Sequence, residues 1–260
     1  MLMLDNLSCS YNGKIILHNI SLEFGAGEIV AIIGPNGSGK TTMMRAMCRV
    51  LKPSGGRVLL NGRDIREFHA RRVAQMISWV SQNNRLAWPF TVHQVVGMGR
   101  FPHRGWVASY TKEDHRAVDA AIRSTGLWKH RDRLINTLSG GEAQRAIIAR
   151  ALAQTPRVLL LDEPVAHLDM KYKIAILDLV RNLAEQGLSI VISLHDLNLA
   201  GLYADKLALL SDGKLFATGV PDLILSKKNL ERVYETEVVI SRHPLNDRPQ
   251  VTPISSFGKK

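Results

Sequence analysis

The order of hydrophobic and polar positions predicts strands and helices in alternation, after an opening made of strands alone. The segments with strand character are Met1–Ser8, Ile15–Phe24, Glu28–Ile33, Arg57–Leu60, Met76–Val80, Val158–Leu161 and Ser189–Leu194. Because helical stretches separate the later strands, we expect an α/β core with a largely parallel sheet. Turn residues separate the first three segments, which predict a small antiparallel β-layer beside that core.

Helical patterns account for much of the remaining chain. One helix is expected from Lys40 to about Val50, because the run from Lys52 to Gly56 contains a proline and two glycines that cannot continue it. Further elements are expected as follows: a helix over Asp169–Gln186, a helix from Asp196, and a hairpin that turns at Asp212-Gly213.

The stretch from Leu86 to Asn136 differs from the rest because its pattern is helical throughout. Thr91 opens a capping box, and Thr111 begins a second helix that Gly126 ends. We expect this block to be a helical insertion into the α/β core.

The composition is that of a folded globular protein, with 45% hydrophobic and 22% charged residues in a chain of 260. No apolar run approaches the roughly 20 residues that cross a bilayer, and the N-terminus does not resemble a secretory signal. Cys9 and Cys48 lack metal-ligand or disulfide spacing and are expected to be small buried hydrophobic residues. These features favour a protein exposed to the cytosol, with a loose tail from Ser255 to Lys260.

The net charge of +11 and the isoelectric point near 9.9 allow three interpretations. Part of the positive charge is concentrated in one stretch, which contains Arg45, Arg49, Lys52, Arg57, Arg63, Arg66, Arg71 and Arg72. A basic surface suits nucleic acid, the anionic cytoplasmic leaflet of a membrane, or solvent alone. Charge by itself does not choose among them.

The strongest chemical pattern is a phosphate cradle. The run Gly34-Pro35-Asn36-Gly37-Ser38-Gly39-Lys40-Thr41 matches G-x-x-x-x-G-K-[ST] and lies between an apolar strand and a helix. Its glycines allow backbone N–H groups to surround phosphate oxygens, and the helix N-terminus adds positive potential. Lys40 is expected to reach the β- and γ-phosphates, and the Thr41 hydroxyl to bind Mg²⁺.

A second pattern places two acids after a buried strand. Val158–Leu161 is wholly apolar and is followed by Asp162 and Glu163. Ligands of open α/β sheets bind at the carboxyl ends of the strands, where these acids are expected to lie. Asp162 is predicted to bind Mg²⁺, directly or through water, and Glu163 to take a proton from an attacking water.

A third pattern, Leu138-Ser139-Gly140-Gly141-Glu142-Ala143-Gln144-Arg145, starts another helix. Ser139 and Glu142 have capping-box spacing, and the helix is expected to run toward Gln154. Two glycines in the first turn disfavour a helix, so they indicate that the backbone approaches another group closely. The chain therefore contains two helix N-termini suited to bind phosphate.

These motifs, in this order, resemble those of ABC-type ATPases over nearly the whole chain. In that family, the helix that corresponds to the one starting at Ser139 here completes the nucleotide site of the opposite subunit. The resemblance implies that Tyr11 stacks on adenine and that Gln82 senses Mg²⁺ and the lytic water. It also implies that His195 contacts the γ-phosphate and that Asp169 lies in a loop that communicates across the dimer.

Two positions depart from the family pattern. Ala166 stands where the family commonly has Ser, so a hydroxyl contact across the dimer is absent or replaced. Glu142 stands where Gln is frequent, although Glu is familiar among importers. Neither position is one of the hydrolytic residues, so an active enzyme is expected.

The resemblance yields a full set of candidate site residues. Those expected to be catalytic are Glu163, His195 and Gln82. Those expected to bind ATP within one copy are Tyr11, Gly34, Pro35, Asn36, Gly37, Ser38, Gly39, Lys40, Thr41 and Thr42. Those expected to bind the ATP of the other copy are Ser139, Gly140, Gly141 and Glu142. The residues expected to hold the cofactor Mg²⁺ are Thr41, Gln82 and Asp162.

The implied fold is α/β: a P-loop NTPase core with a mostly parallel sheet, an antiparallel β-subdomain and an inserted helical subdomain. The chain is expected to be a single ABC ATPase domain over residues 1–260. Residues 1–85 and 155–240 would form the β-layer and the RecA-like core, and residues 86–154 the helical subdomain with the signature helix. Residues 241–260 would be a C-terminal extension.

Three stretches resemble one subgroup, the ATPases of importers of iron–siderophore, haem or cobalamin. They are Met98-Gly99-Arg100-Phe101-Pro102-His103-Arg104-Gly105-Trp106, His195-Asp196-Leu197-Asn198-Leu199-Ala200 and His243-Pro244-Leu245-Asn246-Asp247-Arg248-Pro249. The resemblance implies a second ATPase subunit in a homodimer, two transmembrane permease subunits facing the helical block, and a substrate-binding protein outside. It also implies a peripheral protein on the cytoplasmic face of the inner membrane. The basic charge is then a membrane-side surface, and no nucleic acid is expected.

Other classes remain open at this point. An exporter cassette differs mainly in the Arg100–Trp106 run. A DNA-repair or chromosome ATPase usually carries a long coiled coil, whereas only about 100 residues without sustained heptads separate Lys40 from Ser139. A ribosome-acting factor normally has two cassettes in one chain, and a P-loop kinase needs no element like Ser139–Gly141.

Overall fold

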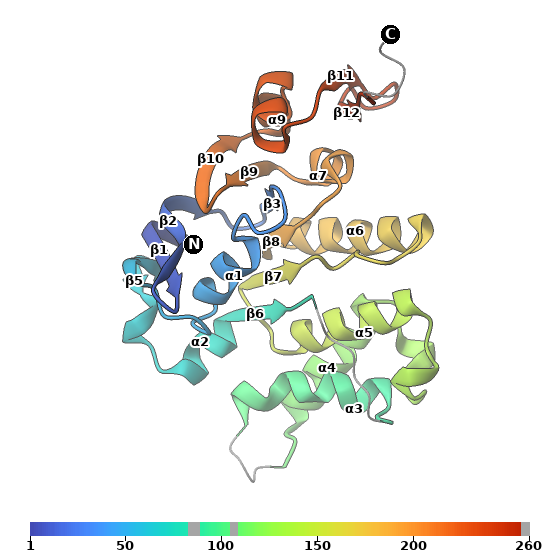
Figure 1. Cartoon of the computed structure of the whole chain (residues 1–260). Coiled ribbons are helices and arrows are strands. Elements are labelled where there is room, and N and C mark those ends of the chain that lie inside the picture. Colours follow the sequence, from blue (N-terminus) through green and yellow to red (C-terminus); the bar gives the residue numbers. More distant parts are fainter. Residues whose placement is uncertain (83–88, 105–108, 256–260) are drawn as a thin grey trace.

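The computed structural model describes residues 1–82, 89–104 and 109–255, which form two main sheets and a block of helices (Figure 1). In Figure 1 the antiparallel sheet lies on the left, the helical block containing α3, α4 and α5 at the bottom, and the C-terminal elements at the top. The parallel sheet lies between these parts. The predicted α/β class with a mostly parallel sheet is confirmed.

The larger sheet has six strands in the order β10-β9-β3-β8-β7-β6. They are β3 (Ile29–Ile33), β6 (Ile77–Val80), β7 (Val158–Asp162), β8 (Ser189–Ser193), β9 (Lys206–Ser211) and β10 (Lys214–Gly219). All pairings are parallel except that of β9 with β10. Every residue of β3, β7 and β8 is buried, as expected for strands covered on both faces.

The smaller sheet is antiparallel, in the order β2-β1-β4-β5. Its strands are β1 (Leu2–Tyr11), β2 (Lys14–Phe24), β4 (Gly55–Leu60) and β5 (Arg63–Asp64). The prediction that Glu28–Ile33 joins this layer is wrong, because β3 pairs with β8 and β9 in the parallel sheet. The reason is visible in burial: β1 alternates between buried and more exposed positions, whereas β3 is buried at all five.

Helix α1 (Lys40–Met47) fills the space between the two sheets with Met43, Met44 and Met47, all fully buried. It ends before the predicted Val50, because Arg49 adopts a left-handed conformation with φ of 61°. The amides of Val50 and Leu51 then turn back to the carbonyl oxygen of Arg45, at 2.9 and 3.0 Å.

The predicted helical block, Leu86–Asn136, contains α3 (Val92–Gly97), the 3₁₀ helix η2 (Met98–His103) and α4 (Lys112–Ser124), and α5 (Gly140–Ala153) follows it. Short 3₁₀ turns η3 (Trp128–His130) and η4 (Ile135–Thr137) connect α4 to α5. Thr91, Thr111 and Ser139 each complete a capping box, which confirms the predicted helix starts. The predicted start of the block at Leu86 lies outside the described residues.

The remaining predicted helices are α6 (Met170–Glu185) and α7 (Leu197–Tyr203), capped by the side chains of Asp169 and Asp196. The hairpin at Asp212-Gly213 is also confirmed, with φ of 48° and 73° at these two residues. A side chain at Gly213 would place its Cβ 1.9 Å from the carbonyl oxygen of Ile16, so the turn requires glycine. The pattern did not predict η1 (Ile65–Glu67) or α2 (Ala70–Met76).

Four further elements that the pattern missed follow the hairpin: α8 (Pro221–Ile224), α9 (Lys227–Tyr234), β11 (Val238–Arg242) and β12 (Pro249–Pro253). Strands β11 and β12 pair as a separate two-stranded sheet. The Asn198 side chain of α7 holds β12, since its Oδ1 accepts from the Val251 amide at 2.7 Å and its Nδ2 donates to the Val251 carbonyl at 3.3 Å. The predicted loose tail lies outside the described residues from residue 256 onward.

The cysteines behave largely as predicted. Cys9 is buried and Cys48 half-buried, and burial raises the pKa of both thiols to about 11. Within the described ranges, no helix has the length and apolar character needed to cross a membrane.

Candidate nucleotide site

The phosphate cradle lies between β3 and α1, and two of its glycines are required by their surroundings. A Cβ at Gly34 would lie 2.2 Å from the carbonyl oxygen of Leu210, and one at Gly39 would lie 2.4 Å from Leu17 Cδ2. Gly34 and Gly39 also have φ of 146° and 101°, which L side chains rarely adopt. The loop is therefore fixed by the neighbouring β9 and β2 as well as by its own sequence.

Lys40 is folded against the loop that precedes it. Its side-chain Nζ donates to the carbonyl oxygens of Gly34 and Pro35 at 2.8 and 3.0 Å, and the residue is 6% exposed. Burial lowers the pKa of Lys40, and the charges of Glu163 and Asp162 oppose that shift. The ammonium group is thus held at the centre of the cradle, close to both acids.

One hydroxyl organises the two acids at the end of β7. Ser193, the last residue of β8, donates to Asp162 Oδ1 at 2.7 Å and accepts from the Glu163 amide at 2.8 Å. Ser193 is fully buried and Asp162 is 1% exposed. Glu163 has a left-handed φ of 50°, so the chain turns sharply after Asp162 and the two carboxylates are held in separate positions.

The three residues predicted to be catalytic are brought together around Glu163. Its Oε2 accepts from Gln82 Nε2 at 2.6 Å, and its Oε1 lies 2.5 Å from His195 Nε2. Gln82 follows β6, Glu163 follows β7 and His195 follows β8, so the residues come from the carboxyl ends of three adjacent strands. Each oxygen of the carboxylate is therefore held by a different partner.

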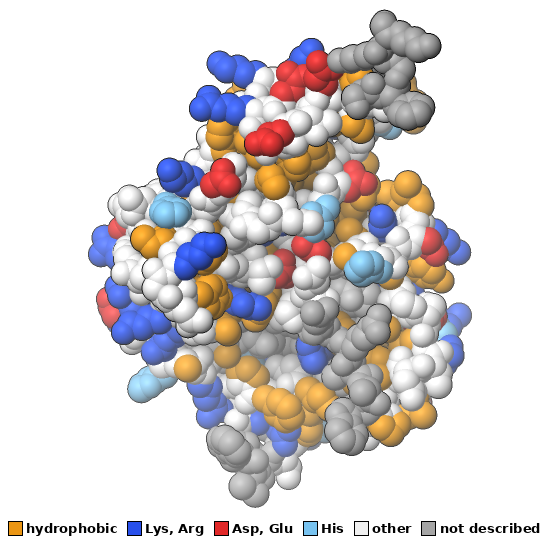
Figure 2. Space-filling model, viewed as in Figure 1, with side chains coloured by type: hydrophobic (Ala, Val, Ile, Leu, Met, Phe, Trp, Pro, Cys, Tyr) orange, Lys and Arg blue, Asp and Glu red, His pale blue; other side chains and the backbone are white. Residues whose placement is uncertain are grey.

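These groups line a cleft of about 710 Å³. Its lining comprises Tyr11, Ile16, Asn36, Gly37, Gly39, Lys40, Thr41, Thr42, Gln82, Glu163, Ala166, His167 and His195. Tyr11 is partly exposed and its hydroxyl accepts from Arg45 Nη1 at 3.2 Å. On the face seen in Figure 2, acidic and histidine side chains gather near the middle, whereas Lys and Arg are frequent over the antiparallel sheet.

The residues predicted to hold Mg²⁺ fit a hard cation. Mg²⁺ prefers oxygen ligands. Asp162 Oδ2 is buried and has no hydrogen-bond partner in the part of the chain that the structure describes. Thr41 and Gln82 line the adjoining cleft. An unsatisfied buried carboxylate oxygen is an atom that a bound cation would satisfy.

The helix start at Ser139 is well formed. The Ser139 amide and hydroxyl both donate to Glu142 Oε2 at 2.9 Å, and these bonds lower the pKa of Glu142. The close approach predicted from the two glycines is explained within the chain at Gly141, where a Cβ would lie 2.3 Å from the Tyr172 ring. Gly140 is exposed.

The helix tip Ser139–Glu142 is absent from the lining of the cleft that contains Lys40. The two elements predicted to bind phosphate therefore do not line one common cleft within one copy. Asp169, the N-cap of α6, accepts from the Tyr172 amide at 3.1 Å, and so lies next to the ring that packs on Gly141.

Comparison with known proteins decides the family. Residues 17–166, more than half of the chain, match the ABC transporter family model. The chain belongs to the ABC transporter family. It is an ATP-binding subunit of this family, and it is therefore an ATPase.

The ABC protein is similar to ATP-binding proteins of transport systems over nearly its whole length. It is 39% identical over 250 residues to the siderophore transport system ATP-binding protein YusV of Bacillus subtilis, covering 96% of this chain and 91% of the relative. It is also 39% identical over 263 residues to the hemin import ATP-binding protein HmuV of Gloeobacter violaceus, covering 98% and 95%. Among solved structures, a metal-chelate type ABC transporter in an inward-facing conformation matches with a TM-score of 0.86 and 25% identity, covering 98% of both chains.

Sequence reasoning missed two residues that contact the predicted site residues. Ser193 lies 31 positions from Asp162 and meets it only through the register of β7 and β8. The one available signal was a hydroxyl that follows the apolar run Ile190–Ile192, two positions before His195. Tyr172 gave no signal beyond its place in the first turn of α6, and its contact with Gly141 depends on how α5 and α6 pack.

Proposed function

We propose that this chain is the ATP-hydrolysing subunit of an importer for a metal chelate, and that it works as a dimer in which each ATP contacts both copies. The observation that carries the proposal is the separation of the two phosphate-binding elements. Lys40 belongs to the cleft, while Ser139 and the exposed Gly140 lie outside its lining. One ATP can contact both elements when a second copy supplies the helix tip.

The dimer then depends on charge. Each helix N-terminus carries positive potential, so two of them facing each other repel without an anion between them. The γ-phosphate supplies that anion and holds the copies together. Hydrolysis and loss of phosphate remove the attraction, which couples the chemistry to opening of the dimer.

Within one copy the residues have separate tasks in hydrolysis. Water attacks the γ-phosphorus and the bond to ADP breaks, while Glu163 takes the proton of the water. Gln82 and His195, which hold the two Glu163 oxygens, orient this base and contact the water and the γ-phosphate. Mg²⁺, held by Thr41, Asp162 and Gln82, would neutralise phosphate charge when bound. Lys40 and the loop amides position the phosphates, and Tyr11 stacks on adenine.

The relatives support the proposed cargo, and the resemblance to importer ATPases supports the proposed partners. The names of YusV and HmuV concern siderophore transport and hemin import, and both relatives match nearly the whole chain. We therefore infer a metal chelate as cargo, taken up through two permease subunits from an outer substrate-binding protein. The ATPase would be a homodimer bound peripherally to the cytoplasmic face of the inner membrane.

Changing Glu163 to Gln tests the hydrolytic mechanism. The amide cannot accept a proton, so we expect ATP turnover to fall by at least about a hundredfold while ATP binding is retained. Light scattering should then detect a dimer that persists with ATP. Glu113→Gln, at an exposed position of α4, is the matched control and should keep parental turnover. Parental turnover in Glu163→Gln itself contradicts the assignment of the base.

The cargo is tested on the purified complex with its permeases. Siderophore-bound iron, hemin and cobalamin, each on a binding protein, are compared for stimulation of ATPase activity, with free iron salt as the control. We expect one chelate to stimulate and free iron to have no effect. Equal rates with every chelate and without any chelate contradict import of this class.

A further inference from the structure

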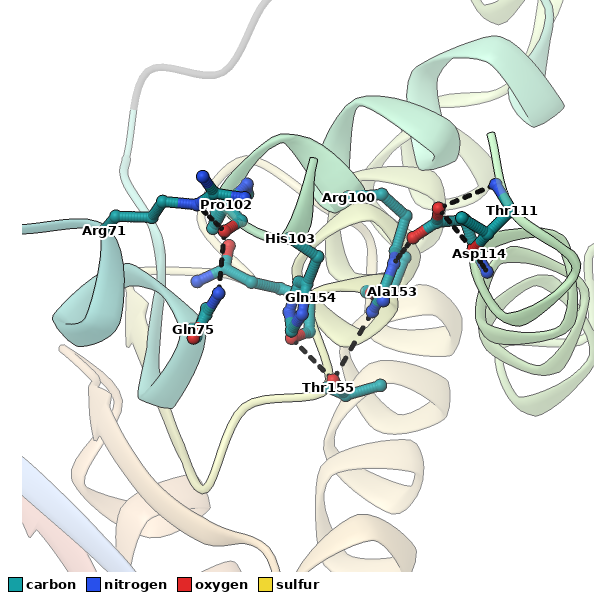
Figure 3. A network of polar contacts seen from close by, with 10 residues as sticks. All are labelled: Arg71, Gln75, Arg100, Pro102, His103, Thr111, Asp114, Ala153, Gln154 and Thr155. Atoms are coloured by element: carbon teal, nitrogen blue, oxygen red, sulfur yellow. Dashed lines mark hydrogen bonds and ion pairs between the residues drawn. The ribbon is translucent and has the colours of Figure 1, made fainter. Parts of the chain in front are cut away.

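The segment η2 (Met98–His103) links the helical block to α2 of the core, and the hydrolytic mechanism above assigns no role to this link. Its sequence belongs to the run that resembles chelate-importer ATPases, of which residues 105 and 106 lie outside the described residues. Figure 3 shows side chains of η2 and of the end of α5 pointing both toward α4 and toward α2. The contacts on the two sides have different partners.

On the helical side, Arg100 binds the end of α5. Its Nη1 donates to the Ala153 carbonyl at 2.9 Å, and its Nε donates to Asp114 Oδ1 at 2.8 Å (Figure 3). Only 2% of the Arg100 side chain and 5% of the Asp114 side chain are exposed. The His103 ring also contacts the Gln154 carbonyl, with Nε2 at 2.8 Å.

The contacts of Arg100 stabilise the C-terminal end of α5. The last carbonyls of a helix lack partners inside it and carry partial negative charge. Arg100 supplies a donor and a positive charge there, while Asp114 balances the buried guanidinium. Gly99 allows the close approach, since a Cβ at that position would lie 2.0 Å from the Arg150 carbonyl oxygen.

On the core side, η2 and α5 are bound to α2 and β6. The Pro102 carbonyl accepts from Arg71 Nε at 2.7 Å and from Gln75 Nε2 at 2.8 Å. Gln154, the C-cap of α5, donates to the Ile77 carbonyl at 3.0 Å and accepts from the Ser78 hydroxyl at 3.3 Å. Strand β6 ends at Val80, so this junction lies between α5 and the strand that precedes Gln82, a residue predicted to be catalytic.

Because α5 is long, the position of its C-terminal end affects the position of its N-terminal tip. The helix has 14 residues and begins at the Ser139 tip. At 1.5 Å per residue it is about 21 Å long, so a tilt of about 5° at the capped end moves the tip by about 2 Å. A hydrogen bond to phosphate tolerates only a few tenths of an ångström.

We propose that Arg100 is a positioning residue which, by holding the C-terminal end of α5 against the core, places Ser139 and Gly140 for contact with the ATP of the partner copy. This inference rests on the proposed function, because it assumes that the tip acts across a dimer. Arg100 lies in neither the cleft nor the tip, so its effect should appear in dimer formation and not in the binding of nucleotide by one copy.

The test compares Glu163→Gln with Glu163→Gln/Arg100→Lys. Lysine keeps the positive charge beside Asp114 but cannot also reach Ala153 with a second, fixed N–H group. We expect the protein concentration for half-maximal ATP-dependent dimerisation to rise about tenfold, as loss of one charged hydrogen bond implies, with the Kd of the monomer for a fluorescent ATP analogue unchanged. Arg181→Lys in the same background is the matched control, because the hydrogen bonds and ion pairs of Arg181 among the described residues go to Asp205 and Glu185 and to no residue of α5.

A milder variant covers the case in which Arg100→Lys fails to fold. Arg71→Ala/Gln75→Ala removes both donors to the Pro102 carbonyl and leaves Arg100 intact. It should raise the dimerisation concentration about threefold with the same nucleotide Kd. Each variant at positions 71, 75 and 100 that folds is compared with the Arg181→Lys control. If every one of them dimerises at the same protein concentration as the control, the inference is wrong. Failure of Glu163→Gln itself to dimerise with ATP contradicts the proposed function instead.

Discussion

Ser193 shows how much of the site depends on a residue outside the recognised motifs. Its hydroxyl binds Asp162 on one side and the Glu163 backbone on the other. The acid expected to bind Mg²⁺ and the base expected to activate water are therefore positioned by one side chain of the neighbouring strand. Their separate orientations, one toward the core and one into the cleft, follow from this bridge and from the left-handed turn at Glu163.

Replacing Ser193 with Ala should therefore weaken both stability and catalysis. It leaves a buried carboxylate oxygen and a backbone amide without their partner, at a cost of about 1–3 kcal/mol in the free energy of unfolding. We also expect a lower turnover number at saturating ATP and a higher Mg²⁺ concentration for half-maximal activity.

The same strand supplies the control. Ser189 is also buried in β8, but its hydroxyl has no hydrogen-bond partner among the described residues. Ser189→Ala should keep parental stability in urea unfolding and parental Mg²⁺ dependence. Equal behaviour of the two alanine variants would show that the Ser193 bridge does not position the acids.

At the residue scale, the sequence could predict those groups whose chemistry requires a fixed local spacing. The Gly34–Thr41 run and the Asp162-Glu163 pair are of this kind, since strand, loop and helix follow one another directly. Ser193 could not be predicted in the same way. Its relation to Asp162 arises from the pairing of two parallel strands, and no local pattern sets that register.

Among the elements, several helices with polar caps were predictable, whereas the short C-terminal helices were not, including α9 with its Ser226 cap. Thr91, Asp169 and Asp196 begin helices where their side chains accept from backbone amides, which is a local signal. Strand β12 begins and ends with proline, which normally argues against a strand. It forms because β11 pairs with it and because Asn198 of α7 binds its centre.

The sheet that β3 joins could not be predicted from the sequence of β3 alone. Its pattern predicts a strand correctly but does not say which of two sheets it joins. The choice follows from burial on both faces, with β8 on one side and β9 on the other. Turn residues before and after it suggested an antiparallel neighbour that is not its partner.

The start of α4 predicts a dependence of stability on pH. Burial alone would raise the pKa of Asp114, but hydrogen bonds from Thr111 and Arg100 outweigh it and lower the pKa to about 2. An unfolded Asp has a pKa of about 3.9, so the stability that this carboxylate contributes is present above that pH. It is lost as the pH falls through about 2.

Thermal unfolding of the parent and of Asp114→Asn, followed by circular dichroism between pH 7 and pH 2, measures this contribution. At pH 7 the variant should be less stable by about 3 kcal/mol, because it leaves Arg100 buried without its counterion. The difference should shrink as the pH falls below about 4. A difference that stays constant down to pH 2 contradicts the ionised state of Asp114 as its source.

For the whole molecule, the proposed function depends on one chain carrying two phosphate-binding elements on different surfaces. The cleft contains Lys40, Glu163 and His195, and the tip of α5 contains Ser139 and Gly140. Leu17 of the β-layer fixes the phosphate loop that lines the cleft, and the junction at Arg100 fixes the tip of α5. Two copies related by a twofold axis can each present the tip to the cleft of the other.

Mixing two inactive variants tests that arrangement most directly. Lys40→Ala disables the cradle, and Ser139→Arg blocks the helix tip, so each variant alone should lack ATPase activity. A mixed dimer has one site in which both elements are intact, and a random mixture should regain about a quarter of the parental rate. A mixture as inactive as its two components contradicts the claim that ATP is shared between copies.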